Sequence, residues 1–597
     1  MRFLPVLVLS LAFLAPCAGP AAAATDGDTL SLIWKPLPNI PTILRPGDTL
    51  TVWAHAPAGA GGWSAALRLA SRTYPLTPLA PAGSGWQTSL GWWVLSFGVP
   101  EGVPEELYDL TLTCGSCSPD VARHAVKVIT AFKDVYYFAQ ISDTHLPQHT
   151  FSSDAQNFNP ADTTGMADFD TVIEDLNLIH PEFILHTGDL VNEAELQDLG
   201  MDVMGSAKAM ISRLRDPMFL VSGNHDIGGW QPTLPPAGSS RKNWWRYFGW
   251  PILANPPAGY PYHSQDYSFD YGRLHCIGLE GYENDGQYDN YLPGLYGAQS
   301  MTQEQMDWLA ADVAAAQPAQ RKLAFIHYDF GGTDPYGYEG PPQFADLGHL
   351  GLSAVIWGHN HGVPEGNLSA YPLNLGLQSV IDRRVFRIFH VRNGAITPGP
   401  MHYTTGIARD DSLHASWVWS TSGRGPTLTA TVTNEYGETW DHARLLFSMP
   451  VSDSGYVATG GTIAQVVPQG STASVYVDYV LPAAGTATVS VTAAGPTHGA
   501  PGAAVRLDAV NPNPYRASQG LLSLNFSVPV AGRAKLAVYD LSGRLVSVLF
   551  DGPADVGDHS AQWNGRSGGG ASVKAGIYLL RLQAPGGDRE AKVTVIP

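Results

Sequence analysis

The sequence predicts a central α/β domain with all-β, Ig-like domains on both sides of it. Between about residues 133 and 407, apolar strand-like runs alternate with helical patterns, which is typical of a layered α/β domain. The segments before and after it contain short alternating runs separated by Gly and Pro clusters, as all-β sandwiches do. The composition agrees, because the 597 residues include 64 Gly and 46 Pro while only 15% are charged.

A chain of this length must contain several hydrophobic cores. We divide it into a signal peptide (1–24), an N-terminal Ig/fibronectin-like sandwich (25–132), the α/β domain (133–407), a second Ig-like sandwich (408–500) and a C-terminal Ig-like domain (501–597). The formal charge of -19, from 34 Lys plus Arg against 53 Asp plus Glu, leaves no basic surface for polymeric nucleic acid.

The N-terminus has the pattern of a secretory signal peptide. Arg2 precedes an apolar core at residues 4–14 and a run of small residues, which predicts cleavage after Ala23 or Ala24. A lipoprotein signal with Cys17 as the modified residue is the weaker alternative, because Pro16 stands where such signals have a small residue. No other apolar run approaches the roughly 20 residues that span a bilayer. We therefore expect bacterial-type export, periplasmic transit and a secreted or cell-surface protein without a transmembrane segment.

Cysteines are few in the mature sequence. The Cys114-Gly-Ser-Cys117 segment lacks the βαβ setting of a redox motif, and no second cysteine pair completes a zinc site. A small structural disulfide in an oxidising compartment is the better interpretation. Cys276 lies in an apolar run and is expected to be buried and inert.

In the α/β domain, five apolar runs end in side chains that bind metals. The carboxyl ends of parallel strands meet at one edge of a sheet, so these side chains are expected to converge. Carboxylate, amide and imidazole groups are suitable ligands for divalent cations. The sequence therefore indicates a two-metal hydrolase. The runs and their terminal residues are VYYFAQISDTH with Asp143 and His145, FILHTGDLV with Asp189, MFLVSGNHD with Asn224, His225 and Asp226, KLAFIHYD with His327, and AVIWGHNH with His359 and His361.

Helical patterns separate these runs. Apolar residues fall on one helical face between the first two runs, and again between the second and third. The first set is Phe169, Val172, Ile173, Leu176 and Ile179; the second is Leu199, Val203, Met210, Ile211 and Leu214.

The C-terminal third of the chain is predicted to be all-β. Segments such as TLTATVTNEYG and ASVYVDYV form the second sandwich, in which nothing indicates chemistry. The last segment contains Asn511-Pro-Asn-Pro514, AKLAVYDLSGRLV and AGIYLLRL. It resembles the Ig-like domain of flagellar hook-capping proteins and equally the sorting domains of type IX secretion cargo. The resemblance implies contact with secretion machinery or attachment to the cell surface.

The order of the five motifs resembles that of the calcineurin-like metallophosphoesterases. The resemblance implies a four-layer metallophosphoesterase-type β-sandwich flanked by helices. It also implies two divalent or trivalent transition-metal ions, for which the oxygen and nitrogen donors suit manganese, iron or zinc. By this resemblance Asp189 bridges the two ions. One ion is then held by Asp143, His145 and His361, and the other by Asn224, His327 and His359.

The same resemblance assigns catalytic roles beside the metals. His225 would protonate the leaving alkoxide or stabilise the transition state, and Asp226 would orient the His225 ring. Gly188, Gly223 and Gly358 would let the backbone pass close to the metals and the phosphate.

The branch of the family decides the expected substrate. Purple acid phosphatases have a tyrosine ligand three residues after the bridging aspartate and lack the first-motif histidine, whereas this chain has Asn192 and His145 at those places. The motifs are closer to those of the cyclic-nucleotide and glycerophosphodiester phosphodiesterases. We predict a secreted binuclear phosphoesterase that cleaves a small phosphate ester, preferentially a diester, by attack of metal-activated hydroxide. One alternative is a purple-acid-phosphatase-like monoesterase, because those enzymes also have an N-terminal β-sandwich before the catalytic domain. The other is an inactive surface-binding protein.

Overall fold

The structure is a computed structural model. It describes residues 30–80, 85–88, 90–147, 164–192, 194–198, 202–227, 239–249, 265–280, 303–328, 336–337, 344–345, 350–361, 373–404, 413–420, 426–469, 472–494, 497–498, 505–507, 513–516, 521–528, 532–540, 544–554, 557–568, 571–584 and 587–596. The predicted signal peptide lies outside these ranges. Among the helices that fall within them, none is both long and apolar enough to cross a bilayer.

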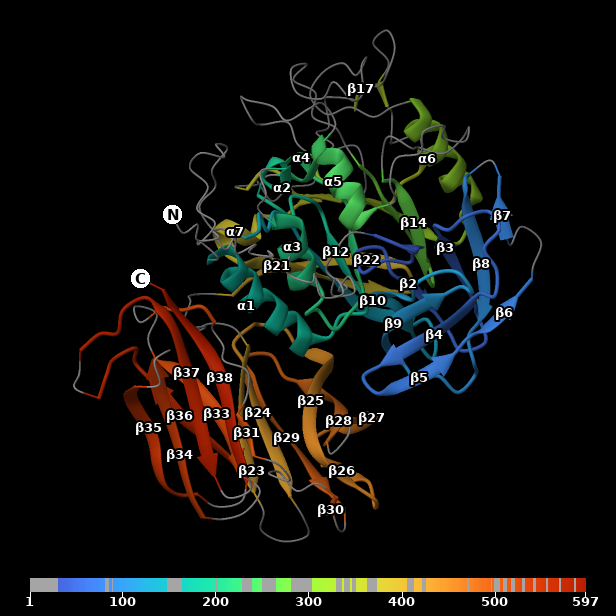
Figure 1. Ribbon diagram of the computed structural model, residues 1–597. Coiled ribbons are helices and arrows are strands. Elements are labelled where there is room, and N and C mark those ends of the chain that lie inside the picture. Colours follow the sequence, from blue (N-terminus) through green and yellow to red (C-terminus); the bar gives the residue numbers. More distant parts are fainter. Residues whose placement is uncertain are drawn as a thin grey trace, which may run out of the picture.

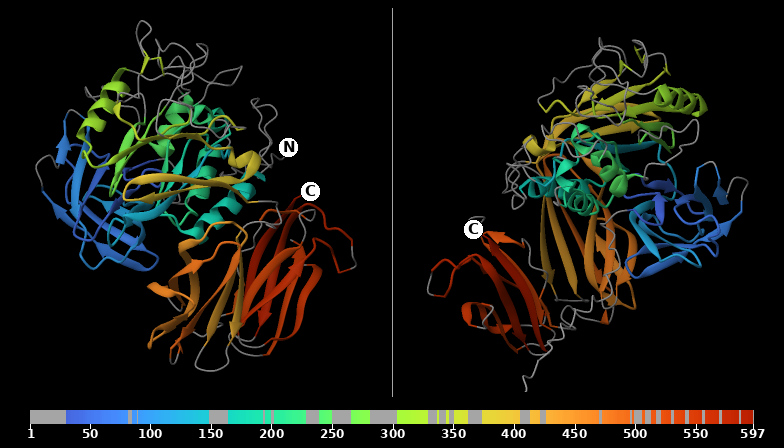
Figure 2. Two further views of the ribbon diagram at one scale, coloured as in Figure 1. Left: turned by 180° about the vertical axis from the view of Figure 1, so that it is seen from behind. Right: turned by 45° about the horizontal axis from the view of Figure 1, so that its top comes forward.

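Two five-stranded sheets lie face to face in the central domain (Figures 1 and 2). The first has the order β13 (Met218–Leu220), β12 (Ile184–His186), β11 (Val135–Ile141), β21 (Val385–Arg392) and β22 (Ala395–Tyr403). The second has the order β14 (Tyr267–Tyr271), β15 (Leu274–Gly278), β16 (Arg321–Phe325), β19 (Ala354–Trp357) and β20 (Asn374–Gly376). Strands β11 to β13 are parallel to one another, as are β15, β16, β19 and β20. A two-stranded sheet pairs β17 (Tyr336–Gly337) with β18 (Phe344–Ala345).

Strand periodicity explains how the layers pack. Along β11, Phe138 points into the core between the sheets, while Ala139 and Ile141 point into the core beneath the helices. In the second sheet, Phe325 faces the inner core and Ala324 the outer one. The predicted four-layer arrangement is therefore confirmed.

Helices cover the outer faces of both sheets (Figure 1). The helices are α1 (Thr164–Ile179), α2 (Glu195–Asp198), α3 (Val203–Ile211), α4 (Asn224–Ile227), α5 (Ser239–Phe248), α6 (Gln303–Ala315) and α7 (Val380–Arg383). The five apolar residues predicted for the first helical face are all buried in α1. In the second set, Val203, Met210 and Ile211 are buried in α3 and Leu214 is buried just after it, whereas Leu199 lies outside the described residues.

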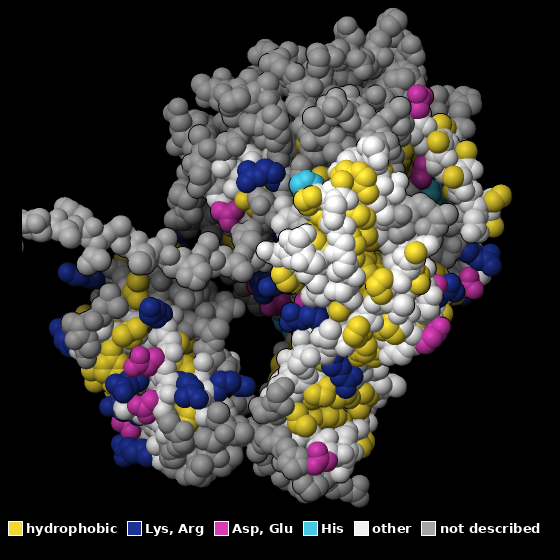
Figure 3. All heavy atoms as spheres, turned by 45° about the vertical axis from the view of Figure 1, so that its right-hand side comes forward, with side chains coloured by type: hydrophobic (Ala, Val, Ile, Leu, Met, Phe, Trp, Pro, Cys, Tyr) yellow, Lys and Arg dark blue, Asp and Glu magenta, His cyan; other side chains and the backbone are white. Residues whose placement is uncertain are grey.

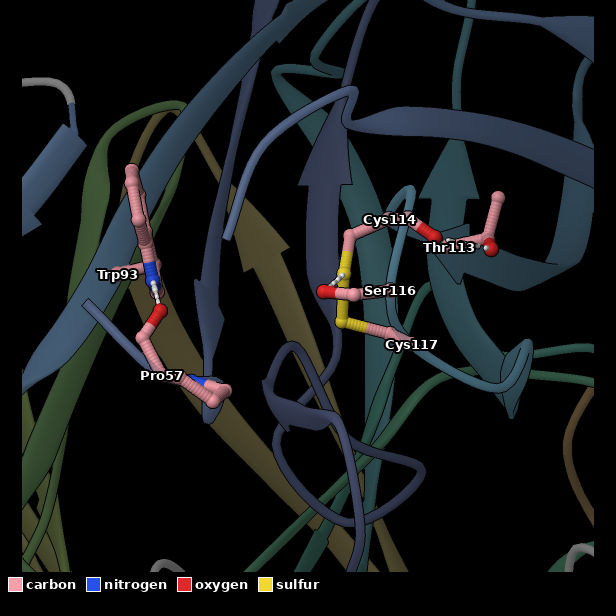
Figure 4. Close-up of a disulfide and its surroundings, with 6 residues drawn as sticks. All are labelled: Pro57, Trp93, Thr113, Cys114, Ser116 and Cys117. Atoms are coloured by element: carbon pink, nitrogen blue, oxygen red, sulfur yellow. Dashed lines mark hydrogen bonds between the residues drawn. A yellow bond between two sulfur atoms is a disulfide. The ribbon is translucent and has the colours of Figure 1, made fainter. Parts of the chain in front are cut away.

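The N-terminal region is an all-β sandwich. One sheet has the order β1 (Ile33–Lys35), β3 (Thr49–Ala54), β8 (Trp92–Gly98) and β6 (Thr77–Leu79), with β7 (Gly85–Gln87) also paired to β8. The other has the order β2 (Thr42–Leu44), β10 (Asp120–Val128), β9 (Glu106–Thr113), β4 (Ser64–Leu69) and β5 (Arg72–Pro75). The predicted Cys114–Cys117 disulfide is present in the turn between β9 and β10, beside Ser116 (Figure 4). Cys276 is a buried free thiol, as expected.

The second sandwich shares a continuous hydrophobic core with the α/β domain. One sheet has the order β23 (Leu413–Ser420), β24 (Thr427–Asn434), β29 (Gly485–Ala493) and β26 (Tyr456–Thr459). The other has the order β27 (Thr462–Gln469), β28 (Thr472–Leu481), β25 (Trp440–Ser452) and β30 (Thr497–His498). The buried residues of α1 and those of β25, Trp440 among them, belong to one cluster. Across this boundary the Tyr436 hydroxyl donates to Asp175 Oδ2 at 2.8 Å.

Charged side chains meet where the N-terminal sandwich, the α/β domain and the second sandwich come together. Arg444 of β25 lies 3.7 Å from Glu106 of the N-terminal sandwich and is hydrogen-bonded to Asp478 at 2.6 Å. Close by, Lys127 Nζ is 4.0 Å from Asp216 Oδ1 of the α/β domain. Four of these five side chains are buried, and Asp478 is the exception. Removing one buried charge would leave its partner in an apolar environment.

The C-terminal region is a further sandwich with its own core. One sheet has the order β31 (Arg506–Leu507), β33 (Leu522–Val528) and β36 (Gly557–Trp563). The other has the order β32 (Tyr515–Arg516), β38 (Gly587–Ile596), β37 (Gly576–Ala584), β34 (Gly532–Asp540) and β35 (Leu545–Ala554). In Figure 3 a gap is visible between this lobe, whose surface carries several Lys and Arg side chains, and the neighbouring part of the molecule.

Candidate metal centre

The predicted ligands converge at one edge of the facing sheets. They leave the carboxyl ends of β11, β12, β13, β16 and β19, which are parallel within each sheet. The connecting loops are tied together, since the amides of Asp143 and His145 each donate at 3.0 Å to the carbonyls of Gly188 and Asp189. Three groups of side chains have donor atoms within 4.8 Å of one another: Asp143, His145 and His361; His145, Asp189 and His225; and Asp189, His327 and His359.

Asp189 lies between two sets of donors. Its Oδ2 is 3.1 Å from His327 Nε2 and 3.7 Å from His145 Nε2. On the His327 side, Asn224 Oδ1 is 3.1 Å from the same His327 nitrogen. On the His145 side, His361 Nε2 is 3.1 Å from His145 Nε2 and 3.5 Å from Asp143 Oδ1. Asp189 is thus placed where a shared ligand would be.

The donor atoms are arranged as ligands of a metal ion would be. The ring nitrogens Nε2 of His145 and His361 lie 3.1 Å apart, a contact that needs either a proton on one of them or a cation that both can bind. Asn224 presents its oxygen to the site, and its buried Nδ2 has no hydrogen-bond acceptor among the described residues. Oxygen and imidazole donors without a thiolate are suitable for manganese, iron or zinc.

The pKa values of the carboxylates and of two histidines show a strongly negative site. Burial opposes ionisation of Asp189, but His327 and His225 outweigh it and hold the pKa of Asp189 well below its usual value. The pKa of Asp143 is lowered in the same way, chiefly by its hydrogen bond with His361 against the effect of burial. Burial would lower the pKa of His327 and His361, yet the carboxylates raise these pKa values to about 9 and about 10. Positive charge is therefore favoured at both histidines.

Two other histidines are held neutral. Burial lowers the pKa of His145 to about 3, and burial together with His327 lowers the pKa of His359 to about 4. A neutral imidazole has a lone pair available, which is the form that binds a metal.

The ligand loops have unusual backbone conformations. Asp143, His145, Asp189 and His359 have φ values of 53°, 45°, 54° and 66°, in the left-handed region that non-glycine residues rarely adopt. Each such residue costs of order 1 kcal/mol or more. Strain at four ligands of one site is characteristic of a functional centre rather than of ordinary turns.

The motif glycines are required by close contacts. A Cβ on Gly223 would lie 2.2 Å from Asp189 Oδ1, and one on Gly358 would lie 1.9 Å from Ser142 Oγ and 2.5 Å from Asp143 Oδ2. A Cβ on Gly188 would lie 2.7 Å from His327 Nδ1. The glycines therefore make room for the ligands themselves.

Gly223→Ala is expected to weaken metal binding by about tenfold or more, because the new methyl group must displace Asp189. Gly102→Ala is the matched control, since a Cβ there meets nothing within 4 Å. Metal content after dialysis against a dilute metal buffer measures the effect. Equal metal retention in the two variants would contradict the steric explanation.

His225 and Asp226 lie beside the metal ligands but do not interact as we expected. Asp226 was expected to orient the His225 ring, and the structure gives the two side chains other hydrogen-bond partners. The Asp226 carboxylate accepts hydrogen bonds from the amides of Leu190, Val191 and Gly223 at 3.1, 2.9 and 2.8 Å. By accepting these three hydrogen bonds, Asp226 connects the loop after β12 with the loop after β13. The His225 ring is oriented instead by the carbonyl oxygen of Asn192, 2.7 Å from Nδ1.

Sequence reasoning missed the groups that orient the ligands. His327 Nδ1 lies 2.8 Å from the Thr187 carbonyl oxygen, and His361 Nδ1 lies 2.6 Å from Asp382 Oδ2. A backbone carbonyl has no sequence signal, and Asp382 belongs to no motif. His186, which is not among the candidate ligands, accepts the Gly188 amide at Nδ1 and contacts the Thr144 hydroxyl at Nε2.

Two segments of the chain match known protein families. Residues 136–363 match the model of the calcineurin-like phosphoesterases, and this range holds all the proposed ligands. The chain contains a calcineurin-like phosphoesterase domain. A second match places an FlgD Ig-like domain at residues 517–588, within the C-terminal sandwich. No curated protein matches the chain.

The chain has weak similarity to solved structures. A purple acid phosphatase from yellow lupin (Lupinus luteus) seeds has 16% identity and a TM-score of 0.30, covering 65% of this chain and 70% of that chain. A dimetal phosphatase from Danio rerio has 16% identity and a TM-score of 0.28, covering 44% and 94%. Latent PorU from Porphyromonas gingivalis has 16% identity and a TM-score of 0.15, covering 36% and 24%.

Proposed function

We propose that this protein is a secreted, binuclear metal-dependent phosphoesterase that hydrolyses a small phosphate ester, preferentially a diester. The observation that carries the proposal is the convergence of seven oxygen and nitrogen donors at the strand ends of a calcineurin-like phosphoesterase domain.

In this proposal Asp189 is shared by two metal ions. Asp143, His145 and His361 hold one ion, and Asn224, His327 and His359 hold the other. When bound, two such ions neutralise phosphate oxygens and lower the pKa of water, the chemistry that ester hydrolysis needs. Manganese, iron and zinc all suit this donor set.

His225 is proposed as the acid that protonates the leaving oxygen. The Asn192 carbonyl accepts a hydrogen bond from Nδ1, so this nitrogen carries a proton and proton transfer takes place at Nε2. The ring is packed edge to face against His145, with centroids 4.9 Å apart, which places it beside the metal ligands. Asp226 contributes indirectly, by holding the two loops on which Asp189 and His225 lie.

Electrostatics favours a small phosphate ester over a large anionic polymer as the substrate. The formal charge of -19 repels a large anionic polymer at long range, whereas a small ester is attracted at short range by the bound cations. The motif spelling supports a diester, since His145 is present and Asn192 stands where purple acid phosphatases have tyrosine. The N-terminal sandwich supports the monoesterase alternative, which we retain together with an inactive surface-binding protein.

The signal peptide and the C-terminal region serve export and attachment in this proposal. We assign residues 1–24 to a signal peptide, 25–132, 408–500 and 501–597 to Ig-like domains, and 133–407 to catalysis. The FlgD-like Ig domain at residues 517–588 supports a role for the last region in export or surface attachment.

The function is tested by comparing kcat/KM for bis-nitrophenyl phosphate and nitrophenyl phosphate under one metal and one pH. Two transition-metal ions per chain and chelator-sensitive hydrolysis are expected, with the diester favoured. A monoester preference beyond about tenfold, or about 1.4 kcal/mol of transition-state discrimination, would restore the monoesterase alternative. A metal-free, inert protein would refute the enzyme.

A further inference from the structure

The short helix α7 contacts two ligand loops at once. The amides of Val380 and Ile381 donate at 3.0 and 3.1 Å to the carbonyl oxygens of Ser142 and Asp143, in the loop after β11. Its Asp382 carboxylate reaches His361, in the loop after β19, with a distance of 2.6 Å between Oδ2 and Nδ1. Helix α7 therefore joins two loops that come from different sheets.

Asp382 is itself held in place by the helix cap. Ser379 is the N-cap residue of α7, and its hydroxyl oxygen accepts the Asp382 amide at 3.3 Å. The same hydroxyl donates to Asp382 Oδ2 at 2.8 Å. A carboxylate with a fixed backbone and a hydrogen bond from Ser379 has few alternative orientations, so it can fix the ring that it contacts.

The two proposed metal sites differ in how their histidines are oriented. In the site with Asn224, the Nδ1 atom of His327 faces the backbone carbonyl of Thr187, and the whole contact is buried. In the other site, the side chains of His361 and its partner Asp382 are 32% and 49% exposed. Orientation of His361 therefore depends on one solvent-accessible side chain, whereas orientation of His327 is built into the backbone.

We propose that Asp382 is the positioning residue of the more exposed metal site, where it fixes His361 with Nε2 directed at the metal. A proton on Nδ1, shared with the carboxylate, leaves the Nε2 lone pair for the cation and makes the ring a stronger donor. The contact also couples the site to α7, which holds the backbone of Asp143, the neighbouring ligand. The inference rests on the proposed two-metal function and adds that one of the two sites can be weakened alone.

The test is a titration of Mn²⁺ into the metal-depleted full-length protein, with free Mn²⁺ measured by electron paramagnetic resonance. Wild-type protein is expected to bind two ions. Asp382→Ala is expected to weaken one site by about 10- to 100-fold and to leave the other unchanged within about twofold. Asp382→Asn keeps an oxygen acceptor for Nδ1 but not the charge, so its loss should be smaller than that of the alanine variant.

Asp134→Ala is the matched control. This exposed carboxylate, at the other end of β11, pairs with Arg273 at 3.2 Å, and its loss should change neither site. Wild-type affinity at both sites in Asp382→Ala would overturn the inference. Equal weakening of both sites with a lower melting temperature would also overturn it, because that result indicates a structural role.

The two proposals can fail separately. Wild-type protein that binds two ions but hydrolyses no ester would refute the proposed function while the Asp382 result still stands. Absence of Mn²⁺, zinc and iron binding in the wild-type protein would refute the two-metal proposal before any variant is compared.

Discussion

Asp189→Asn is expected to lose both metal ions and essentially all hydrolysis. The Asp189 carboxylate lies between His145 and His327, so its negative charge serves both proposed sites. Removing that charge leaves two dications to repel each other across a buried space. We expect kcat/KM to fall by about a thousandfold or more, equivalent to about 4 kcal/mol of transition-state stabilisation. Metal analysis and ester hydrolysis on the same preparation measure the effect.

The asparagine variant should still fold. Asp189 Oδ1 accepts the His225 amide at 3.0 Å, and an amide oxygen can keep that hydrogen bond. Asp134→Asn, which removes an exposed charge, is the control and should retain both metals and activity. Full metal occupancy in an active Asp189→Asn protein would rule out the bridging assignment.

His225→Ala is expected to keep its metals while turnover falls by about a hundredfold or more, the usual range for removal of a general acid. The reason is that His225 donates its proton to the leaving oxygen, whereas the seven ligands remain. The loss should therefore be smaller for nitrophenyl esters, which need little protonation, than for alkyl esters. Turnover on both ester types, with metal content measured in parallel, gives the answer.

Two controls separate chemistry from folding in this experiment. His225→Gln fills the buried space and should show the same dependence on the leaving group. His414→Ala changes a half-buried histidine of β23 in the second sandwich and should have no effect on turnover. An equal loss for nitrophenyl and alkyl esters would remove His225 from the acid role.

The fold and the grouping of the candidate ligands could be predicted because both follow from local patterns. Apolar runs that end in Asp, Asn or His can be recognised without coordinates, and parallel strands bring their ends to one edge. For that reason residues as distant in sequence as Asp143 and His361 were expected together and lie together. The glycines were also expected, because close approach to a ligand is a common reason for a glycine in a loop.

The groups that orient the ligands could not be predicted in the same way. Thr187 and Asn192 act through backbone carbonyls, which every residue has. Asp382 is distinguished only by its contact with His361, and that contact depends on how α7 docks. The role expected of Asp226 rested on its adjacency to His225 in the sequence. In the structure the two side chains, at the start of α4, have different hydrogen-bond partners.

The continuous core that joins α1 to β25 determines which part of the chain could be transplanted. Recombination can move a domain into another protein only if that domain buries its own hydrophobic residues. The C-terminal sandwich meets this condition, so the same tail could be appended to unrelated enzymes without redesign. The second sandwich does not, because its apolar residues complete the layer beneath α1. The unit that folds together therefore extends beyond the 136–363 segment that matches the phosphoesterase model, and a fragment without the second sandwich would expose apolar residues beneath α1.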